Sequence, residues 1–470
     1  MEANATPFVG NDTPRVRPSY GGSGASSSYW ALFVIVLATF LTFFDQVVFG
    51  MLAEQIKKDF GLTDSQLGFL AGPASIICYL FVGIPLARLA DIFPRKYVLA
   101  AGAGVVGVII SLGGLAQNYG QFVVSRVFLA AGGSAHAPAA YSLLADAFPP
   151  KKLTRAFALL QFGFIGGTSL GPAIGGYLVV MSVGWGASEF LGVRIFGWQW
   201  ILILMGLPSL LVAGLLMTIK EPLRASVGVV AEPSLKTASF GRQIITFMGW
   251  DAAKAIHANR KVYYPLFGAL ALSAVEVFGL QFWRVPFMVR TFGWNEAQIG
   301  AALSIVGLTG SLVGLAIGGI FVEWLAKRYK DANVRAACLF FIGTTISSIS
   351  AVLMPTAWGA MIAFGFAVMF GMAGAVPQNA AIQRVAPNAM RGQVTAFYLF
   401  MFTFFGAMGS FVIGIVAQYV IGDPAKLWQA LLMTAGTLLP LATFLMFKAI
   451  KPYRQEVERL EQLEKDQAYV

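Results

Sequence analysis

About twelve stretches of this chain are apolar over ~20 residues, the length that a helix needs to cross the hydrocarbon core of a membrane. Only 12% of the residues are charged, against about a quarter in soluble domains, and the mean hydropathy is +0.72. We therefore predict an all-α integral membrane protein with twelve transmembrane helices. The stretches run roughly over 30–50, 65–87, 97–115, 121–144, 155–180, 199–218, 263–289, 297–322, 337–355, 358–381, 394–420 and 428–450.

One short segment occurs twice, as FGLTDSQLG (60–68) and as FGWNEAQIG (292–300). Each copy follows one apolar stretch and opens the next. Thr63 with Gln66, and Asn295 with Gln298, have the spacing of a helix capping box or a variant of it. The longest polar loop, 219–262, separates six stretches from six. The repeat therefore predicts two pseudo-symmetric six-helix bundles that rock against each other, as in many transporters.

Five segments follow from this pattern. We expect a disordered N-terminal tail at 1–28, a first bundle at 29–218, a linker at 219–262, a second bundle at 263–450 and a C-terminal tail at 451–470. Part of the linker, about 236–258, is a candidate for a short amphipathic helix on the inner membrane surface. The C-terminal tail has helical propensity and is interpreted as a solvated tail or, alternatively, as a partner-binding helix.

The net charge of +11 is explained by topology and not by a nucleic-acid partner. With both termini in the cytoplasm, most of the 33 Lys and Arg residues fall in cytoplasmic tails, loops and helix ends, which is the positive-inside pattern. The exceptions on the outer side are Lys57, Lys58, Arg194, Arg290 and Lys426. Neither a disulfide framework nor a nucleotide-binding glycine loop is expected, and we predict no metal and no cofactor.

Four segments carry a family resemblance: PLARLADIFPRKYVL (85–99), RVFLAAGG (126–133), GTSLGPAIGG (167–176) and QRVAPNAMRGQVTAFYLF (383–400). Together they resemble the major facilitator superfamily and, within it, the spinster-like transporters. The resemblance covers about 30–450. It implies alternating access, a cavity lined by helices 1, 4, 7 and 10, and a monomer. In animals the spinster family is associated with lysosomal and lipid export.

The first of these segments implies a gate at the cytoplasmic side. Its members are Arg88, Asp91, Arg95 and Lys96; the resemblance implies that the acid caps a neighbouring helix and that the basic residues pair across the halves when the protein is open to the outside. Glu323, with Lys327 and Arg328, occupies the equivalent loop of the second half, and Arg391 is assigned to the same layer. The alternative is that all are merely positive-inside anchors.

Charges inside a membrane are costly, so they are functional candidates. At 1.5 Å per residue, Asp45 lies ~22 Å from the inner end of its stretch, Arg126 ~8 Å from the outer end of its own, and Glu276 ~20 Å from an inner end; these depths nearly coincide in a ~30 Å core. We predict that Asp45 pairs with Arg126, and that Glu276 faces the cavity across from them and carries a proton. The alternatives are a static bridge and a polar residue satisfied in a helix contact.

Two positions depart from the spinster pattern. Gln46 stands where that family usually has Arg, and Gly133 stands where it usually has Glu. Because Glu276 and Arg284 occur on helix 7, where apolar residues are expected, the acidic function is interpreted as having moved there.

Other polar residues in the stretches are candidates for substrate or proton contacts. Arg284 either reaches out to water or anchors an anionic substrate, with Gln281 one turn away. His136 is either a proton relay or a packed polar residue. The full set of predicted substrate contacts is Gln46, Gln161, Gln281, Arg284, Gln378, Asn379 and Tyr398.

The glycine-rich segment has two interpretations. Gly167, Gly171 and Gly175 form a flat face for close helix packing, next to Pro172, which adds a bend, and Gly176. The segment also resembles a motif of proton-driven antiporters, which favours export.

We therefore expect a secondary transporter in a bacterial inner membrane, and not an enzyme. It is predicted to move an amphipathic or organic-anion small molecule, with lysolipids as one candidate class, by proton-coupled alternating access. Its partners are the substrate, protons and the bilayer. The rival hypotheses are a proton-coupled uptake symporter for a small carboxylate, an uncoupled lipid facilitator, and a sensor that binds without transporting.

Overall fold

The fold was taken from a computed structural model, which describes residues 25–77, 93–134, 136–190, 192–222, 250–386 and 391–468. Among these residues, ten helices are long and apolar enough to cross a membrane. The other two predicted crossings correspond to α3, after which helical backbone resumes at 73–77, and to α6 with α7, which only residue 135 separates. The predicted all-α fold of twelve helices in two bundles is confirmed.

The elements of the N-terminal half are α1 (Ala25–Met51), α2 (Ala53–Phe60), α3 (Asp64–Ala71), α5 (Arg95–Gly113), α6 (Tyr119–Ser134), α7 (His136–Ala147), α8 (Pro150–Val183), the antiparallel strands β1 (Ser188–Phe190) and β2 (Val193–Ile195), and α9 (Gly197–Met217). Those of the C-terminal half are α12 (Trp250–Ala258), α13 (Arg260–Phe292), α14 (Glu296–Ala326), α15 (Ala332–Leu353), α16 (Ala357–Val385), α17 (Arg391–Ile415), the short turns η2 (Val416–Ile421) and η3 (Pro424–Lys426), and α18 (Leu427–Ala468).

Three segment boundaries differ from the expected ones. Helix α1 begins at Ala25, inside the expected tail, and α13 begins at Arg260, inside the expected linker. Helix α12 coincides with the end of the candidate amphipathic helix at 236–258, of which 236–249 lie outside the described residues. Helix α18 continues well beyond residue 450, and Tyr453 and Val457 are buried against the second bundle. The start of the C-terminal segment is thus packed and not solvated, because its apolar residues recur one helical turn apart and form a stripe that faces the core.

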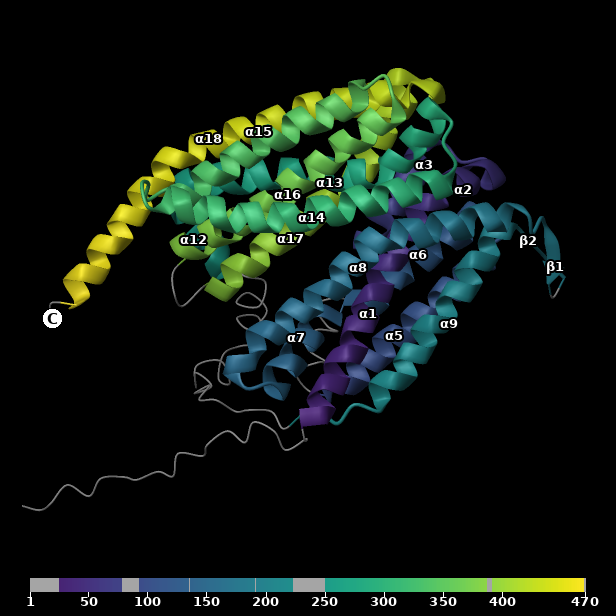
Figure 1. The fold of residues 1–470 in the computed structure, drawn as a ribbon, viewed down its shortest axis with the longest axis horizontal. Helices are drawn as coiled ribbons and strands as arrows, with labels where there is room; N and C mark the ends of the chain where they lie inside the picture. Colours follow the sequence, from purple (N-terminus) through teal and green to yellow (C-terminus); the bar gives the residue numbers. More distant parts are fainter. Residues whose placement is uncertain are drawn as a thin grey trace, which may run out of the picture.

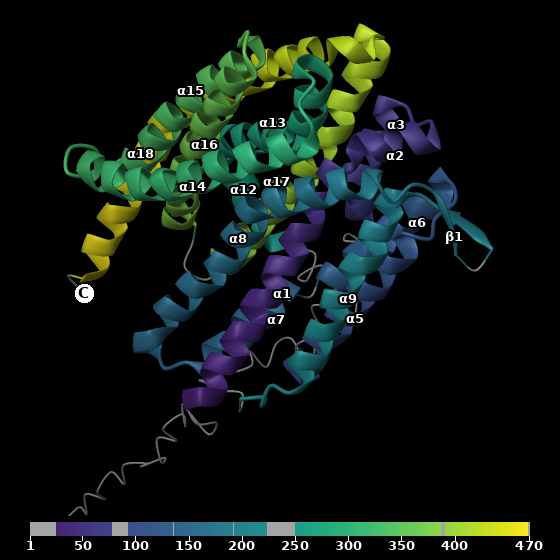
Figure 2. The same cartoon turned by 45° about the vertical axis from the view of Figure 1, so that its right-hand side comes forward.

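The two halves meet at one end of the molecule and diverge at the other (Figures 1 and 2). We call the end that carries β1 and β2 the hairpin end, and the end where α1 begins and α18 ends the tail end. At the hairpin end one apolar cluster joins both halves and includes Phe122 and Trp283. Toward the tail end it is replaced by separate clusters, two in the C-terminal half and one in the N-terminal half.

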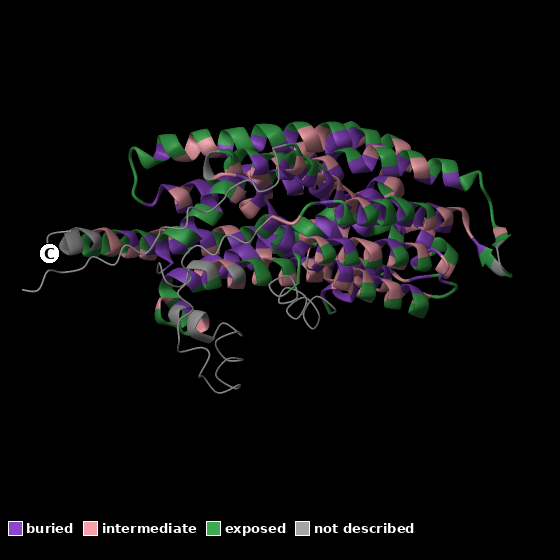
Figure 3. Cartoon of the chain, turned by 90° about the horizontal axis from the view of Figure 1, so that it is seen from below, coloured by how far each residue is buried: buried purple, intermediate pink, exposed green. Residues whose placement is uncertain are grey.

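Large apolar side chains remain exposed on the outer faces of both halves, among them Leu211 (71% exposed) and Ile320 (70% exposed). Figure 3 shows exposed residues along the outer helices and buried ones between them. An apolar surface this extensive is stable in lipid and not in water, as expected for a membrane-embedded protein.

The sequence repeat performs the same structural task in each half. Both predicted capping boxes are confirmed: Thr63 caps α3 by accepting from the backbone of Gln66, and Asn295 caps α14 by accepting from the backbone of Gln298. Just before each box the preceding helix ends in a glycine with positive φ, Gly61 at 63° and Gly293 at 68°. Glycine adopts this left-handed conformation without steric cost.

The last glycine of each repeat copy lets the two halves touch. Gly68 of α3 lies against the backbone of α17, and Ser410 Oγ donates to the Gly68 carbonyl at 2.8 Å. Gly300 of α14 lies against the carbonyl of Pro172 on α8, and the Ala173 amide donates to Ser304 Oγ at 2.9 Å. These two helix pairs, α3 with α17 and α8 with α14, hold the halves together near the hairpin end.

Replacing Gly300 with alanine is expected to destabilise this arrangement by about 1–3 kcal/mol, because the added methyl group would collide with backbone that cannot move aside. Thermal unfolding in detergent measures the effect. The matched control is Gly319→Ala on the same helix, where a methyl group meets nothing within 4 Å and higher helix propensity should be neutral or slightly stabilising. Equal unfolding temperatures for the two variants would contradict the prediction.

Candidate functional site

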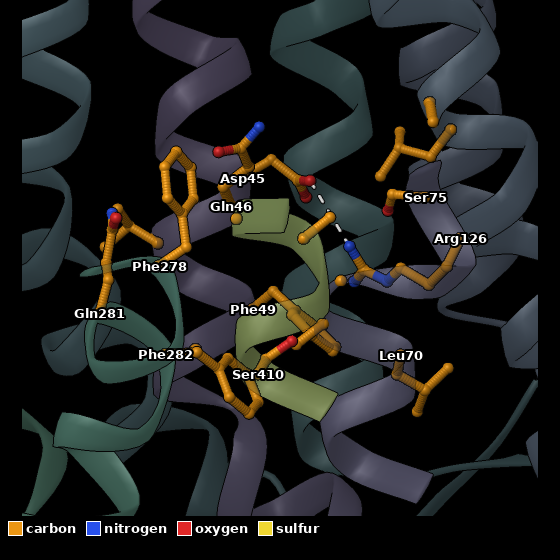
Figure 4. A pocket seen from close by; sticks show the side chains of 18 of the residues that line it. Asp45, Gln46, Phe49, Leu70, Ser75, Arg126, Phe278, Gln281, Phe282 and Ser410 are labelled. Carbon is orange, nitrogen blue, oxygen red and sulfur yellow. Dashed lines mark ion pairs between the residues drawn. The ribbon is translucent and has the colours of Figure 1, made fainter. Parts of the chain in front are cut away.

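A cavity of about 350 Å³ lies between the halves, on the tail-end side of the joined apolar cluster. Its walls come mainly from α1, α3, α6, α13 and α17, with single residues from α5 and α14, and Figure 4 shows many of the side chains that line it. Most lining residues are apolar. The polar ones include Thr42, Asp45, Gln46, Ser75, Arg126, Ser134, Gln281, Arg284, Thr403 and Ser410.

The structure brings Asp45 and Arg126 together on one wall. Arg126 Nη1 lies 3.5 Å from Asp45 Oδ2, and both residues are buried. The Arg126 guanidinium also lies over the ring of Phe49, 4.0 Å from its centroid, and 5.1 Å from that of Phe122. Asp45 Oδ1 is buried without a hydrogen-bond partner. The distance between the two charged groups is thus long for an ion pair, and only one carboxylate oxygen of Asp45 takes part in it. Aromatic rings supply much of the environment of the Arg126 guanidinium.

Gln46, Gln281 and Arg284 also line the cavity. In Figure 4, Gln46 and Gln281 lie on the side opposite Arg126. Arg284 forms no ion pair with any described residue, and its buried Nε has no hydrogen-bond partner. Arg284 is half-buried and lines the cavity between the halves.

Glu276 does not occupy the predicted position. It is 1% exposed and absent from the cavity wall. Its carboxylate instead faces the Thr434 hydroxyl of α18, inside the second bundle, but outside hydrogen-bonding geometry, so that neither oxygen has a partner. Depth along a helix can be read from residue number, but the face that a residue presents depends on how the helix is rotated in its bundle.

Five more candidates lie away from the cavity wall. His136 Nε2 is 2.9 Å from Thr39 Oγ1, a hydroxyl that already donates to the Ile35 carbonyl, which suits the packed alternative. Gln161 and Asn379 are exposed, whereas Gln378 and Tyr398 are buried within the second bundle. The presence of a polar residue in an apolar stretch therefore did not distinguish residues that line the cavity from these five, which do not.

The sequence analysis did not identify the aromatic residues of the cavity wall. Phe278 and Phe282 of α13 line the cavity with Gln281 and Val285. Their spacing of three and four residues places them on one face of the helix. That periodicity, taken together with Gln281, is a signal that could have found them.

A charge network at the hairpin end, also unpredicted, closes the halves against each other. Arg290 of α13 contacts Asp64 of α3 at 2.8 Å and donates from Nε to Glu54 of α2 at 2.9 Å. Lys57 contacts the same Asp64 at 2.5 Å. Lys57 and Arg290 were exceptions to the positive-inside pattern, and this was the available sign that they serve a purpose other than topology.

The network is expected to resist mild acid. Asp64 begins α3, just before the predicted crossing at 65–87. Burial by itself would raise the pKa of Asp64, but hydrogen bonds and charges from Arg290 and Lys57 outweigh it and hold the pKa below its usual value. A depressed pKa means that this stabilisation is complete above the usual pKa of about 4 and is lost as pH falls through the lower pKa of the closed state.

Spin-label distances across the hairpin end, between Gln117 and Tyr419 in a background without the native cysteines, measure this closure. Both positions are exposed, one in each half. The distance distribution should be unchanged between pH 7 and 5 and should broaden to longer distances below about pH 4. Opening already at pH 6 would show that another group controls the closure.

Comparison with known proteins identifies the chain. Residues 35–410 and 266–468 match the family model of the Major Facilitator Superfamily. This chain belongs to that superfamily. It is therefore an integral membrane protein and a secondary transporter of small molecules, and not an enzyme.

Relatives within the superfamily agree with the predicted resemblance to spinster-like transporters, which is confirmed. An MFS-type efflux pump of Mycolicibacterium smegmatis is 25% identical over 92% of this chain and 95% of its own. Protein spinster of Drosophila melanogaster is 21% identical over 68% of this chain and 49% of its own. The crystal structure of a bacterial homologue of human spinster, inward-facing and unoccupied, has a TM-score of 0.73 at 21% identity and covers 93% of this chain and 98% of its own.

The superfamily gating motif is partly visible. Arg88 and Asp91 lie outside the described residues. Arg95 is buried and pairs within the N-terminal half, with Asp146 at 2.5 Å and Glu221 at 2.9 Å. The Lys96 amide donates to the same Glu221, and its ammonium lies over the ring of Tyr97. The Arg95 pairing across the halves, which the resemblance implies for the opposite state, is thus not made here.

In the loop of the second half that is equivalent to the gating loop, Asp331 and not the predicted Glu323 forms the ion pairs. Glu323 is exposed and forms no ion pair with any residue in the described ranges. Asp331, fully buried at the start of α15, pairs with Arg335 at 2.7 Å and with Arg454 at 2.9 Å. Burial alone would raise the pKa of Asp331, but these two arginines outweigh it and hold the pKa below its usual value. Of Arg391, only the backbone is described, at the start of α17.

The glycine-rich face of α8 packs against α1, as its close-packing interpretation expects. Gly167 lies against the Phe40 carbonyl of α1, and Gly171 and Gly175 face apolar side chains of α1. Gly176 faces the opposite half, at the carbonyl of Glu296 on α14. Together with the contact between Pro172 and Gly300, this shows that α8 packs against helices of both bundles.

Proposed function

We propose that this transporter moves an amphipathic or organic-anion small molecule by proton-coupled alternating access, in a bacterial inner membrane, as a monomer with both termini in the cytoplasm. On this assignment the tail end is cytoplasmic, and the hairpin end is closed by Arg290, Asp64 and the helix pairs that contain Gly68 and Gly300. The divergence of the halves toward the tail end makes the described state inward-facing.

One observation carries the substrate assignment: an unpaired Arg284 lies in a largely apolar cavity between the two halves. Arg284 is half-buried; a cation without a partner in a largely apolar site is costly, and an anionic group on the substrate would offset that cost. The surrounding Phe49, Phe278 and Phe282 would accommodate an apolar body. Lysolipids remain one candidate class among such amphiphiles.

The proton assignment is supported by Glu276. Because a charged carboxylate without hydrogen bonds is strongly disfavoured in an apolar interior, Glu276 favours a bound proton in this state. It lies about two helical turns from Arg284 on α13. A change in the protonation of Glu276, at the contact between α13 and α18, could therefore be transmitted along α13 to the cavity. Asp45 and Arg126, which line the cavity and are only loosely paired, are the second candidate group.

Proton flux in proteoliposomes tests the proposal. Liposomes containing the protein and an internal pH dye should show faster proton movement than protein-free liposomes when aromatic or aliphatic acids or lysolipids are added, since undissociated acids also cross a bare bilayer and set the background. Substrate movement without a proton signal would favour the uncoupled facilitator. Accumulation restricted to small carboxylates would favour the uptake symporter, and binding without movement would favour a sensor.

A further inference from the structure

The charge of the cavity wall limits which substrates it can bind. Among the described residues that line the cavity, three side chains are charged: Asp45, Arg126 and Arg284. Asp45 and Arg126 form an ion pair and cancel each other. Arg284 is left, so the described part of the wall carries one uncompensated positive charge. One negative charge on a ligand would neutralise it, and two would leave an excess in an apolar site.

Arg126 is not available as a second anion site. Its guanidinium is in contact with Asp45 and lies over the ring of Phe49 at 4.0 Å. An anion placed there would face the Asp45 carboxylate at close range. Like charges in a poorly solvated site repel strongly, so an incoming anionic group is directed to Arg284.

Arg284 has the chemistry for this role. A guanidinium presents a planar fork of donors that matches carboxylate and phosphate oxygens. Its Nε is buried and unpartnered, and a buried charged donor without an acceptor is costly. Gln281, one turn earlier on α13, and Gln46 of α1 offer neutral amides in the same cavity, which can hydrogen-bond the ligand without changing the charge balance.

Apart from a few hydroxyl side chains, the remaining described wall is apolar and aromatic. Phe278 and Phe282 come from the same helix as Arg284, and Phe49 and Leu70 come from the N-terminal half. Figure 4 shows Phe49, Phe282 and Leu70 around the cavity and Phe278 beside Gln46. A ligand that met Arg284 with its charged end would place its body against side chains of both halves.

We propose that the cavity selects amphipathic monoanions: an aryl or alkyl body with one anionic oxygen group that Arg284 binds, while Asp45 and Arg126 stay paired. This deepens the proposed function and rests on it for the identity of the cavity as the transport site. Cationic and uncharged amphiphiles of the same shape, and dianions, are predicted to bind more weakly.

Equilibrium binding to the full chain in lipid nanodiscs, at neutral pH and without any gradient, tests this selectivity. The probes are naphthalene-1-acetate, 2-(1-naphthyl)ethanol, 2-(1-naphthyl)ethylammonium and naphthalene-2,6-dicarboxylate, with decanoate, decanol and decylammonium as an alkyl series. The monoanion of each series should bind at least about tenfold more tightly than its uncharged and cationic counterparts. This factor corresponds to the usual free-energy contribution of a charge-assisted hydrogen bond.

Three variants locate the selectivity. Arg284→Gln should remove the preference for the monoanion, and Arg284→Lys should keep part of it because the charge remains. Arg194→Gln is the matched control, since it makes the same change at an exposed residue of the β1–β2 hairpin, and it should bind like the wild type. Size-exclusion profiles and thermal unfolding report whether each variant folds.

Several results would overturn the inference: equal binding of monoanion and ammonium by the wild type, undiminished monoanion binding by a folded Arg284→Gln, or no binding of either monoanion. If Arg284→Gln does not fold, the wild-type series and Arg284→Lys still decide. Failure of the proposed function has a different signature, because monoanion-selective binding without any proton movement in liposomes would contradict proton coupling and leave the inference intact.

Discussion

In proteoliposomes containing Glu276→Gln, substrate-driven proton movement is expected to fall to the level of protein-free liposomes. Glutamine has nearly the shape of glutamate but cannot gain or lose a proton at neutral pH. Glu276 is almost fully buried and neither of its oxygens has a hydrogen-bond partner, so the substitution removes a protonation site without removing an ion pair. Exchange of labelled substrate across the membrane at equal pH should persist, because the cavity wall is unchanged.

The matched control for this change is Glu189→Gln, on the exposed β1 strand, which should couple like the wild type. If Glu276→Gln retains full proton movement, Glu276 is a structural polar residue, and the coupling group must be sought at Asp45 and Arg126. If equal-pH exchange is lost as well, the substitution has damaged the transport cycle itself and not its coupling to protons.

In Arg290→Gln, the closed state of the hairpin end is expected to be destabilised relative to the open state, so that more of the molecules are open. The substitution removes the side chain that joins α13 to both Asp64 and Glu54, and leaves the fully buried Asp64 with Lys57 alone. Breaking a buried ion pair costs about 3–5 kcal/mol when the remaining charge has no partner. Because Lys57 stays, a shift on the order of 2 kcal/mol is expected, about 30-fold in the equilibrium between closed and open states.

Spin labels at Gln117 and Tyr419 report this opening as a second, longer distance. The control is Lys426→Gln, which removes an exposed cation near the same end whose ion pair, with Asp423, lies within the C-terminal half. An unchanged distance distribution in Arg290→Gln would show that the helix contacts at Gly68 and Gly300 suffice to hold the halves together.

Properties that depend on residue type and spacing along one helix were predictable from the sequence. Apolar length predicts the crossings, the repeated FG segment predicts the two capped helix starts, and depth along a helix placed Asp45 level with Arg126. Each of these is set within a single helix, or by the membrane thickness that all helices share.

Properties that depend on contacts between helices were not predictable in the same way. Glu276 lies at the expected depth but faces α18, whereas Arg284, eight residues further along α13, faces the cavity. The rotation of a helix is decided by packing, and α13 is buried on most sides, so its apolar pattern does not mark one face. The partners of Arg290 come from another bundle and lie more than two hundred residues away in the chain.

The sequence by itself thus determined the class of protein, the number of helices, their two-fold arrangement and the set of costly intramembrane charges, because the bilayer imposes these through length, hydropathy and charge. Only the tertiary structure decided which of those charges are paired, which one lies unpaired in the cavity, and which end of the molecule is closed. Those outcomes depend on side chains from both halves meeting within a few ångströms, and no local pattern in the chain specifies such a meeting.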